Sequence, residues 1–257
     1  MRLISLRWIP TRVPALIKFV RLLCFADVHS PRYLSLFIAS MARASIEGVS
    51  AVLMAGDVVE RGRVEALKHV LTVLRRHVKD APLYAVFGNE EYFEKEREFI
   101  EAYPEITWLN DSVAELELDA ARICIVGSRG VLAKPTHWQA KHIPNIHALY
   151  RERLRKLRDL LRECRSRCSK VILLTHYASS MATVKGEPPS IHSYLGYPII
   201  EGLPPEARPD IAVHGHAHNS KVLKAVVNGV EVHNVAIPAR RSITLISLAL
   251  EPNPTNA

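Results

Sequence analysis

The chain has 257 residues, of which 48% are hydrophobic, and its 34 Lys and Arg exceed its 26 Asp and Glu to give a formal net charge of +8. This composition excludes a disordered or fibrous protein, and the length is sufficient to bury a substantial hydrophobic core. A basic chain favours anionic partners such as nucleic acid or phosphorylated small molecules.

The two ends of the chain are expected to lie outside the folded part. Residues 1–17 are interpreted as an N-terminal extension. Pro10 and Pro14 interrupt this segment and no small-residue cleavage site follows it, so no secretory signal is predicted. Residues 251–257 are interpreted as a tail. No run approaches the ~20 apolar residues that span a bilayer, so we expect no membrane partner and a cytoplasmic protein.

Strands and helices alternate in the first half of the chain. Nearly continuous apolar runs predict strands at 19–26, 51–55 and 83–87, and apolar residues at helical spacing predict helices at 33–46, 64–78 and 92–103. This alternation indicates strand–helix–strand units with parallel strands. Strands that are apolar on both faces are expected where helices cover both faces of a sheet.

The second half is less regular. Short strands are predicted at 107–109, 113–118 and 122–126, and an irregular stretch at 130–145 and a basic helix at 146–167 are interpreted as a helical insertion (130–167). A strand at 171–175 precedes a loop at 178–209, which is expected to form a rim over a functional site. Further strands are predicted at 211–214, 222–227, 230–235 and 242–248, and Asn228-Gly229 is a hairpin signal between two of them. Because no convincing linker is present, residues 1–257 are interpreted as one domain.

The four cysteines do not suggest a covalent framework. Cys24 and Cys124 lie in apolar runs and are expected to be small core residues. Cys164 and Cys168 lie four residues apart on the predicted helix at 146–167, and the chain contains no pair of cysteines separated by two residues. We therefore predict neither a zinc site made of thiolates nor a disulfide framework.

Polar residues follow five of the predicted strands at the point where each strand ends. In open α/β sheets the carboxyl ends of the strands gather the functional groups, so these side chains are expected to lie close together. They are Asp27 and His29 after the first strand, Asp57 after the second, Asn89 after the third, His176 after the strand at 171–175, and His216 and His218 after the strand at 211–214.

This set of side chains indicates a pair of transition-metal ions. Imidazole mixed with carboxylate and amide oxygen suits Mn, Fe or Zn better than Ca or Mg, which prefer ligand shells made only of oxygen. Any one of these motifs is common by chance, and a lone buried His is more often a hydrogen-bonded core residue. Five motifs at five strand ends are harder to explain by packing, because burying so many ionisable groups without a cation is strongly unfavourable.

The order of the motifs resembles the calcineurin-like metallophosphoesterase superfamily: Asp-x-His, Gly-Asp, Gly-Asn followed by an acid, a lone His, and Gly-His-x-His. The resemblance implies a four-layer α/β fold in which two mixed β-sheets pack as a sandwich flanked by helices. It also implies two divalent metal ions (Mn, Fe, Zn or Ni, with Mn expected to serve in vitro). Asp27, His29 and His218 would be ligands of the first metal and Asn89, His176 and His216 of the second, with Asp57 as the bridge.

The activity implied by the resemblance is hydrolysis of phosphomonoesters or phosphodiesters by a metal-bridging hydroxide, with Asp57 as a catalytic residue. One position departs from the family pattern, since Glu90 stands where the family usually has His. A Glu with a raised pKa could donate a proton to the leaving oxygen, whereas an ionised Glu would repel a phosphate. Glu91 fits the acidic position that follows.

Two further residues are candidates for substrate binding. Gly56-Asp57-Val58-Val59-Glu60-Arg61-Gly62 resembles a block of the protein Ser/Thr phosphatase branch, which suggests Arg61 as a phosphate clamp. The competing interpretation of Arg61 is an exposed residue in the first turn of a helix. Asn89 is expected to contact substrate as well as metal, and His214 is a candidate for supporting the metal ligands.

Two other functions compete with this prediction. The chain could be a scaffold of the same fold with weak or no catalysis, although every ligand position is filled. It could instead be a nucleic-acid phosphodiesterase. The basic side of the helix at 146–167 fits nucleic acid, but a solvated face with ion pairs four residues apart is favoured. The expected substrate is therefore a phosphorylated small molecule or nucleotide. His137, His142, His147 and His192 are interpreted as surface residues.

Overall fold

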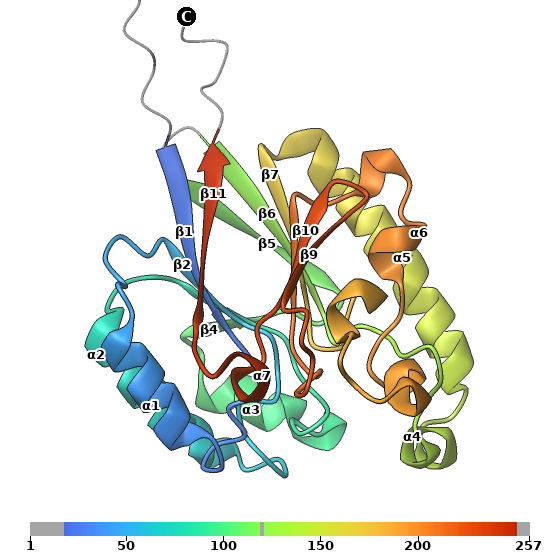
Figure 1. Cartoon of the computed structure of the whole chain (residues 1–257), viewed down its shortest axis with the longest axis horizontal. Coiled ribbons are helices and arrows are strands. Elements are labelled where there is room, and N and C mark those ends of the chain that lie inside the picture. The colour runs from blue at the N-terminus through green and yellow to red at the C-terminus, as the bar shows by residue number, and fades with distance from the viewer. Residues whose placement is uncertain (1–17, 119–120, 251–257) are drawn as a thin grey trace, which may run out of the picture.

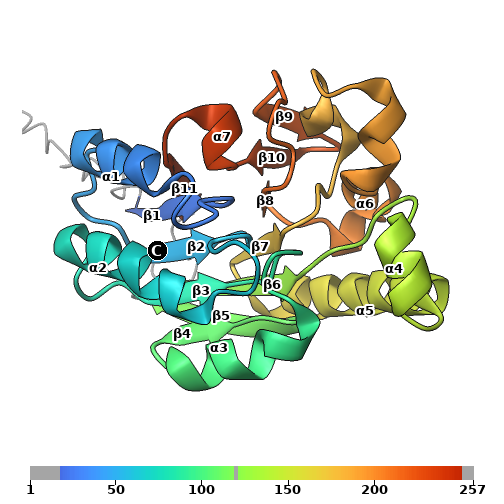
Figure 2. The same ribbon diagram turned by 90° about the horizontal axis from the view of Figure 1, so that it is seen from below.

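Two mixed β-sheets packed face to face, with helices outside them, make up the molecule (Figures 1 and 2). The structure is a computed structural model that describes residues 18–118 and 121–250. The expected N-terminal extension at 1–17 and tail at 251–257 lie outside the described residues. The layers are those that the family resemblance implies.

The first sheet has the strand order β11-β1-β2-β3-β4. Strands β1 to β4 run parallel to one another, and β11 pairs antiparallel with β1. The strands are β1 Lys18–Phe25, β2 Ala51–Met54, β3 Leu83–Ala85, β4 Ile106–Trp108 and β11 Thr244–Leu250. The carboxyl ends of β1, β2 and β3 therefore meet at one edge of this sheet.

The second sheet has the strand order β5-β6-β7-β8-β10-β9. Its central pairs are parallel, whereas β5 with β6 and β9 with β10 are antiparallel. The strands are β5 Ser112–Leu118, β6 Ala121–Ser128, β7 Lys170–Thr175, β8 Ile211–His214, β9 Lys224–Val227 and β10 Val230–Asn234. Asn228 and Gly229 have φ values of 51° and 84° between β9 and β10, which confirms the predicted hairpin turn.

Helices cover the outer faces of the two sheets (Figure 1), with α1 and α2 beside the first sheet and α5 and α6 beside the second. The α-helices are α1 Leu34–Arg43, α2 Leu67–His77, α3 Glu96–Ala102, α4 His137–His142, α5 Ile146–Arg167, α6 Ile199–Gly202 and α7 Ile237–Arg240. The 3₁₀ turns are η1 Val64–Ala66, η2 Phe93–Lys95, η3 Met181–Val184, η4 Pro189–Tyr194 and η5 Pro205–Ala207. Within 18–118 and 121–250, no helix combines the length and the apolar character needed to cross a membrane.

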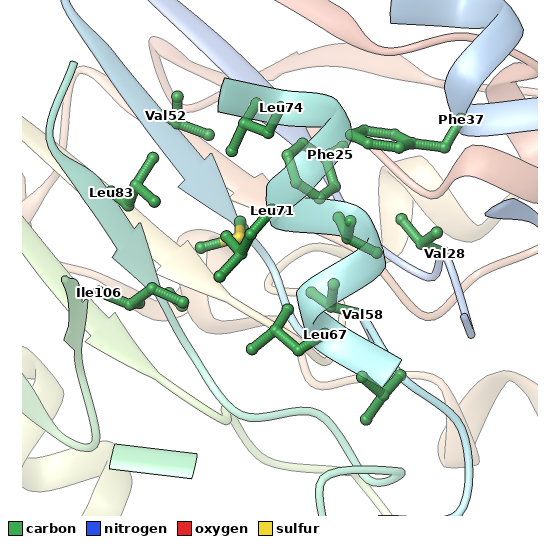
Figure 3. Close-up of a cluster of buried hydrophobic side chains, with 14 of the residues drawn as sticks. Phe25, Val28, Phe37, Val52, Val58, Leu67, Leu71, Leu74, Leu83 and Ile106 are labelled. Carbon is green, nitrogen blue, oxygen red and sulfur yellow. The ribbon is translucent and has the colours of Figure 1, made fainter. Parts of the chain in front are cut away.

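The alternation of side chains along β1 explains why its sequence is apolar throughout. Leu23 and Phe25 belong to the core under the helices, whereas Leu22 and Cys24 belong to the core between the sheets. Figure 3 shows residues of α2, such as Leu74, packed over the strands of the first sheet. The expectation that helices cover both faces is wrong, because the second sheet takes the place of one helical layer.

Two stretches that the sequence predicts as irregular contain short helices. Helix α4 lies within 130–145, and its start is a capping box in which the Thr136 hydroxyl accepts from the Gln139 backbone N–H. The segment 178–209 contains η3, η4, α6 and η5 rather than a plain loop. Such short turns lack the repeated apolar spacing by which longer helices are recognised, so periodicity does not reveal them.

The prediction of no disulfide is also wrong, because Cys124 on β6 is bonded to Cys168 at the end of α5. The two residues are separated by 44 positions in the chain, and their Cα atoms lie 6.0 Å apart. Cys124 faces the core under α5, and α5 ends with Cys168 beside that strand. Cys24 and Cys164 are free and buried, which agrees with the expectation for Cys24.

Candidate metal centre

The turns that follow the strands bring the predicted polar residues together. Asp27 and His29 follow β1, Asp57 follows β2 and Asn89 follows β3, whereas His176 follows β7 and the two remaining histidines follow β8. The turns of the first sheet are joined by backbone hydrogen bonds from Asp27 N–H to the Gly56 carbonyl at 3.0 Å and from His29 N–H to the Asp57 carbonyl at 2.9 Å. The site therefore lies where the two sheets meet.

Two clusters of candidate ligands form in this place. The first consists of Asp27, His29 and His218, and the second of Asp57, His176 and His216; within each, the ligand atoms lie within 4.8 Å of one another. In the first, Asp27 Oδ1 lies 2.8 Å from His218 Nε2 and 3.7 Å from His29 Nε2. Only the shorter of these two distances is a hydrogen-bond length, so the three side chains converge on a common point that a shared metal ion could occupy.

Asp57 and Asn89 connect the second cluster to its surroundings. Asp57 Oδ2 lies 3.5 Å from His176 Nε2 in its own cluster and 3.8 Å from His29 Nε2 in the other. Asn89 Oδ1 lies 3.1 Å from His176 Nε2. The Asp57 carboxylate therefore stands between the two clusters, and Asn89 extends the second one.

The hydrogen bonds of the histidines leave lone pairs directed into the site. His176 Nδ1 lies 3.0 Å from the Ala55 carbonyl, which can only accept, so Nδ1 carries the proton and Nε2 does not. Two lone-pair atoms, His176 Nε2 and Asn89 Oδ1, then face each other with no proton between them. His29 Nε2 is buried and has no hydrogen-bond partner. A cation at the first cluster would satisfy His29 Nε2 and one at the second would satisfy the other two atoms, so these residues fit two metal sites.

The charges within the site are also consistent with a bound cation. Burial raises the pKa of Asp57 well above its usual range, and the carboxylates of Glu91 and Asp27 raise it further. Burial opposes ionisation of Asp27 too, but His218, which hydrogen-bonds to it, holds the pKa of Asp27 well below its usual range. Burial lowers the pKa of His176 well below its usual value, so this ring is neutral and free to bind metal. Divalent cations would stabilise both carboxylates in their ionised form.

The sequence matches the calcineurin-like phosphoesterase family model over residues 20–220. The chain belongs to the calcineurin-like phosphoesterase family. This is a family of metal-dependent phosphoesterases, and the two His and Asp clusters are consistent with its dinuclear metal site. A search of curated protein sequences finds no match.

Solved structures share the fold at low sequence identity. Phosphopantetheinyl hydrolase from Mycobacterium tuberculosis is 14% identical with a TM-score of 0.61, over 92% of this chain and 97% of that one. A putative 5′-nucleotidase from Staphylococcus aureus is 15% identical with a TM-score of 0.56, over 93% of this chain and 52% of that one. GAP50, the anchor in the inner membrane complex of Plasmodium, is 12% identical with a TM-score of 0.55, over 91% of this chain and 77% of that one. At this identity the likeness shows the fold alone.

In this calcineurin-like phosphoesterase, Glu91 holds the turns of the first sheet together. Its carboxylate is buried and accepts hydrogen bonds from the backbone N–H groups of Gly88 at 2.7 Å, Asp57 at 2.8 Å and Val59 at 3.1 Å. A Cβ atom at Gly88 would collide with the Asp57 carboxylate, and one at Gly215 would collide with Asp27. The motif glycines are therefore needed because the backbone passes close to the two carboxylates.

Four of the candidate ligands adopt a left-handed backbone that non-glycine residues rarely occupy. Their φ values are 58° for Asp27, 42° for His29, 49° for Asp57 and 69° for His216. Such residues cost on the order of 1–3 kcal/mol each and persist only where the surroundings fix them. Here the hydrogen bonds between the turns and to Glu91 provide that constraint.

The structure places Glu90 beside the metal residues and Arg61 farther out. The Glu90 backbone N–H donates to Asp57 Oδ1 at 2.8 Å, and its carboxylate accepts from the Arg61 N–H at 2.7 Å. The Arg61 side chain is exposed, so its role as a phosphate clamp stays a prediction. Glu60 pairs instead with Arg32 at 3.4 Å and with Arg63 at 3.7 Å.

Two residues near the site were missed or understated by the sequence analysis. Arg129 follows β6, is buried, and donates to the carbonyls of Gly88 and Glu91 and to the Glu96 carboxylate at 2.7 Å. Its place after a strand was the available signal. His214 is fully buried, its Nε2 lies 2.7 Å from the Thr183 hydroxyl, and burial lowers its pKa to about 4.

The other histidines named from the sequence do not join the clusters. His137, His142 and His147 are exposed, as expected, and His142 stacks on Trp138 with ring centroids 4.9 Å apart. His192 Nε2 donates to the Glu187 carbonyl at 2.9 Å. The predicted ligands Asp27, His29, Asp57, Asn89, His176, His216 and His218 do come together.

Proposed function

We propose that this protein hydrolyses phosphomonoesters or phosphodiesters with two divalent cations held by these seven residues. The observation that supports this most directly is the position of Asp57, whose Oδ2 stands 3.8 Å from His29 Nε2 in one cluster and 3.5 Å from His176 Nε2 in the other. A carboxylate in this position can be shared by two cations, which is the arrangement that two-metal phosphoester hydrolysis requires.

Each cluster would hold one cation. Asp27, His29 and His218 would bind the first, and His176, His216 and Asn89 the second, with Asp57 shared between them. When bound, two divalent cations activate water and neutralise the charge that develops on the transferring phosphoryl group. The protein orients these ligands through Ala55 and Tyr194, whose carbonyls accept from His176 Nδ1 at 3.0 Å and His216 Nε2 at 3.2 Å.

Glu90 is proposed to lie next to the leaving group. It lines a cavity that adjoins the metal residues, and its backbone is fixed by Asp57. In the proposed reaction, a protonated Glu90 donates its proton to the departing oxygen. Because the Arg61 N–H competes for the same carboxylate, this donation is expected to be weaker than that of the His usual in the family.

The competing functions have less support. A scaffold that binds no metal would not require the lone pairs of His29 Nε2, His176 Nε2 and Asn89 Oδ1 that are directed into the site. For a nucleic-acid phosphodiesterase, the basic face of α5 would have to contact phosphates, but three of its arginines already pair with acids: Arg162 with Asp159 at 3.6 Å, Arg165 with Asp210 at 2.5 Å and Arg167 with Glu163 at 3.5 Å.

The test uses protein loaded with Mn²⁺ and assayed on p-nitrophenyl phosphate and its bis ester. We expect turnover of at least one compound and about two metal ions per chain by elemental analysis. Asp57→Asn and His216→Ala should reduce the rate by about a hundredfold or more, since each removes a ligand. His147→Ala, an exposed His on α5, is the matched control and should not change it.

Two results would contradict the proposal. Metal binding without turnover of either compound would favour the scaffold. Faster cleavage of single- or double-stranded DNA than of either small ester would favour the nucleic-acid phosphodiesterase.

A further inference from the structure

A cavity of about 720 Å³ opens beside the metal residues. Asn89 and His216, both candidate ligands of the second cluster, form one end of it. Much of the remaining wall is formed by the segment after β3, by α4 and by Thr136, which directly precedes α4. This wall includes Tyr92, Phe93 and Trp138. This volume lies in the range of cavities that bind small organic molecules. A phosphoester held at the metal residues would therefore have its organic part at the entrance of this cavity.

The aromatic side chains of the cavity are partly exposed to solvent, although His142 stacks on Trp138 and the Arg129 guanidinium lies against Phe93. Trp138 is 52% exposed, Tyr92 40% and Phe93 36%, and these are three of the eight large hydrophobic residues exposed among the described part of the chain. Solvent-exposed aromatic residues that gather at one cavity mark a binding surface. A flat ring of a ligand could cover them, because aromatic faces stack with little dependence on the identity of the ring.

The charges at the cavity argue against a second phosphate. Arg129 is the only Arg or Lys among the lining residues, and its two terminal nitrogens are engaged by backbone carbonyls and by Glu96. Its guanidinium also lies 4.1 Å from the centre of the Phe93 ring. Glu94 adds negative charge. A diphosphate or polyphosphate extension would be repelled here.

The polar groups on the floor of the cavity are already paired. The Gln139 side chain accepts from the Thr136 N–H at 2.9 Å and the Tyr150 hydroxyl at 3.2 Å, and it donates to the Tyr177 hydroxyl at 3.0 Å. Gln139 and Tyr177 are buried. The floor is therefore held in place by its own hydrogen bonds, and the surface offered to a ligand is mainly aromatic.

From these observations we infer that the cavity binds the alcohol part of the ester, and that this part carries a flat, uncharged ring such as an aryl group or a nucleobase. Trp138 is the main specificity-determining residue. The inference rests on the proposed function for the position of the phosphate. It narrows the substrate class to ring-bearing phosphoesters, in preference to small alkyl phosphates and to polyphosphates.

The test compares substrates whose leaving groups are similar in reactivity. Mn²⁺-loaded protein is assayed on 2-naphthylmethyl phosphate and on ethyl phosphate, both esters of primary alcohols, and on phosphocholine. We expect kcat/KM for the naphthylmethyl ester to exceed that for ethyl phosphate by about tenfold or more. Trp138→Ala should reduce this ratio by about tenfold by raising the KM for the naphthylmethyl ester. Phe19→Ala, an aromatic residue 56% exposed at the start of β1, should leave the ratio unchanged.

The outcomes separate this inference from the proposed function. Equal kcat/KM for the naphthylmethyl and ethyl esters would overturn the inference and leave the proposed function intact. A preference for phosphocholine would overturn the inference in favour of a substrate with a cationic group, which the Glu94 carboxylate would attract. If no ester is hydrolysed, the inference about the cavity is tested by calorimetric titration of the Mn²⁺-loaded protein with 2-naphthylmethylphosphonate and ethylphosphonate. If the naphthyl compound binds more tightly than the ethyl compound and Trp138→Ala weakens its binding, the inference that the cavity binds a flat ring is supported. Equal binding of the two compounds overturns this inference.

Discussion

At the scale of single residues, the buried carboxylate of Glu91 has the largest structural role outside the ligand set. It receives three backbone N–H groups from the turns after β2 and β3, the turns that carry Asp57 and Asn89. Burial raises the pKa of Glu91 even though these hydrogen bonds and Arg129 act in the opposite direction. The family pattern indicates an acid at this position, and the structure explains it as the anchor of two ligand-bearing turns.

Replacing Glu91 should therefore weaken both the fold and the metal site. Glu91→Ala leaves three buried N–H groups without an acceptor, and each such group costs about 1–3 kcal/mol. We expect a loss of at least ~3 kcal/mol in the free energy of unfolding by urea titration and a metal affinity about 10–100-fold lower. Glu98→Ala on α3, whose side chain is 57% exposed, is the matched control. Equal effects of the two variants would contradict the assigned role.

Glu90 offers a second prediction at this scale. Glu90→His introduces the residue usual in the family and supplies a better proton donor near pH 7. We expect the rate on a poor leaving group, glycerol phosphate, to rise about tenfold relative to the rate on p-nitrophenyl phosphate, which needs no proton. Steady-state kinetics on both compounds measure this ratio. The neighbouring Glu94→His should not alter it, and an unchanged ratio in Glu90→His would remove Glu90 from the leaving-group chemistry.

At the scale of elements, α5 differs from a simple amphipathic helix. Its buried face includes Arg153, although the basic side of this helix was expected to be solvated. Arg153 Nε donates to both Asp111 oxygens at 2.9 Å, and its Nη1 donates to the Gly130 carbonyl at 3.1 Å. Through these contacts α5 is tied to the turn before β5 and to the segment after β6, next to Arg129.

Removing Arg153 should be far more damaging than removing a neighbouring arginine. Arg153→Ala leaves the Asp111 carboxylate and the Gly130 carbonyl without their partner, and breaking a buried ion pair in this way costs about 3–5 kcal/mol. Arg155→Ala, on the same helix with a side chain 73% exposed, should cost less than about 1 kcal/mol. Urea unfolding of the two variants measures the difference. If the free energy of unfolding falls equally in both variants, the Arg153–Asp111 pair contributes no more to stability than an exposed ion pair.

At the scale of the whole molecule, the residues of the candidate metal site join the two sheets. The His216 N–H donates to Asp27 Oδ2 at 2.9 Å, so a turn of the second sheet is fixed to a turn of the first. His176 makes a similar link to Ala55. Each proposed cation would take ligands from both sheets and would add to these links.

Removing metal should therefore lower the stability of the entire protein. A ligand present at 100 times its Kd adds about 2.7 kcal/mol to the folded state. For a chain of this size this corresponds to a rise in Tm of roughly 5–10 °C. We expect EDTA to lower Tm by this amount and added Mn²⁺ to restore it in calorimetry. The Tm of Asp57→Asn should change much less on addition of EDTA or Mn²⁺. A Tm of the unmodified protein that is insensitive to EDTA would contradict the proposed metal site.

The candidate ligands and the positions of the core strands along the chain could be predicted from the sequence because both depend on local patterns. Apolar runs that end in Asp or His are visible in the chain, and Asp27 to His218 were found in this way. The residues that support them were not predictable by the same means. Arg129, Arg153 and the Cys124–Cys168 bond depend on contacts between segments distant in the chain, and α4 is too short for periodicity to detect.

The left-handed backbone at Asp27, His29, Asp57 and His216 has a consequence for laboratory evolution. At His29, whose Nε2 has no hydrogen-bond partner, glycine would relieve that strain without removing a hydrogen bond of this nitrogen, so thermal stability and metal retention are opposed at this position. A screen for heat resistance alone, carried out in the presence of a chelator, is expected to select glycine at His29 and to yield more stable but inactive variants. The same screen with turnover required should keep the histidine.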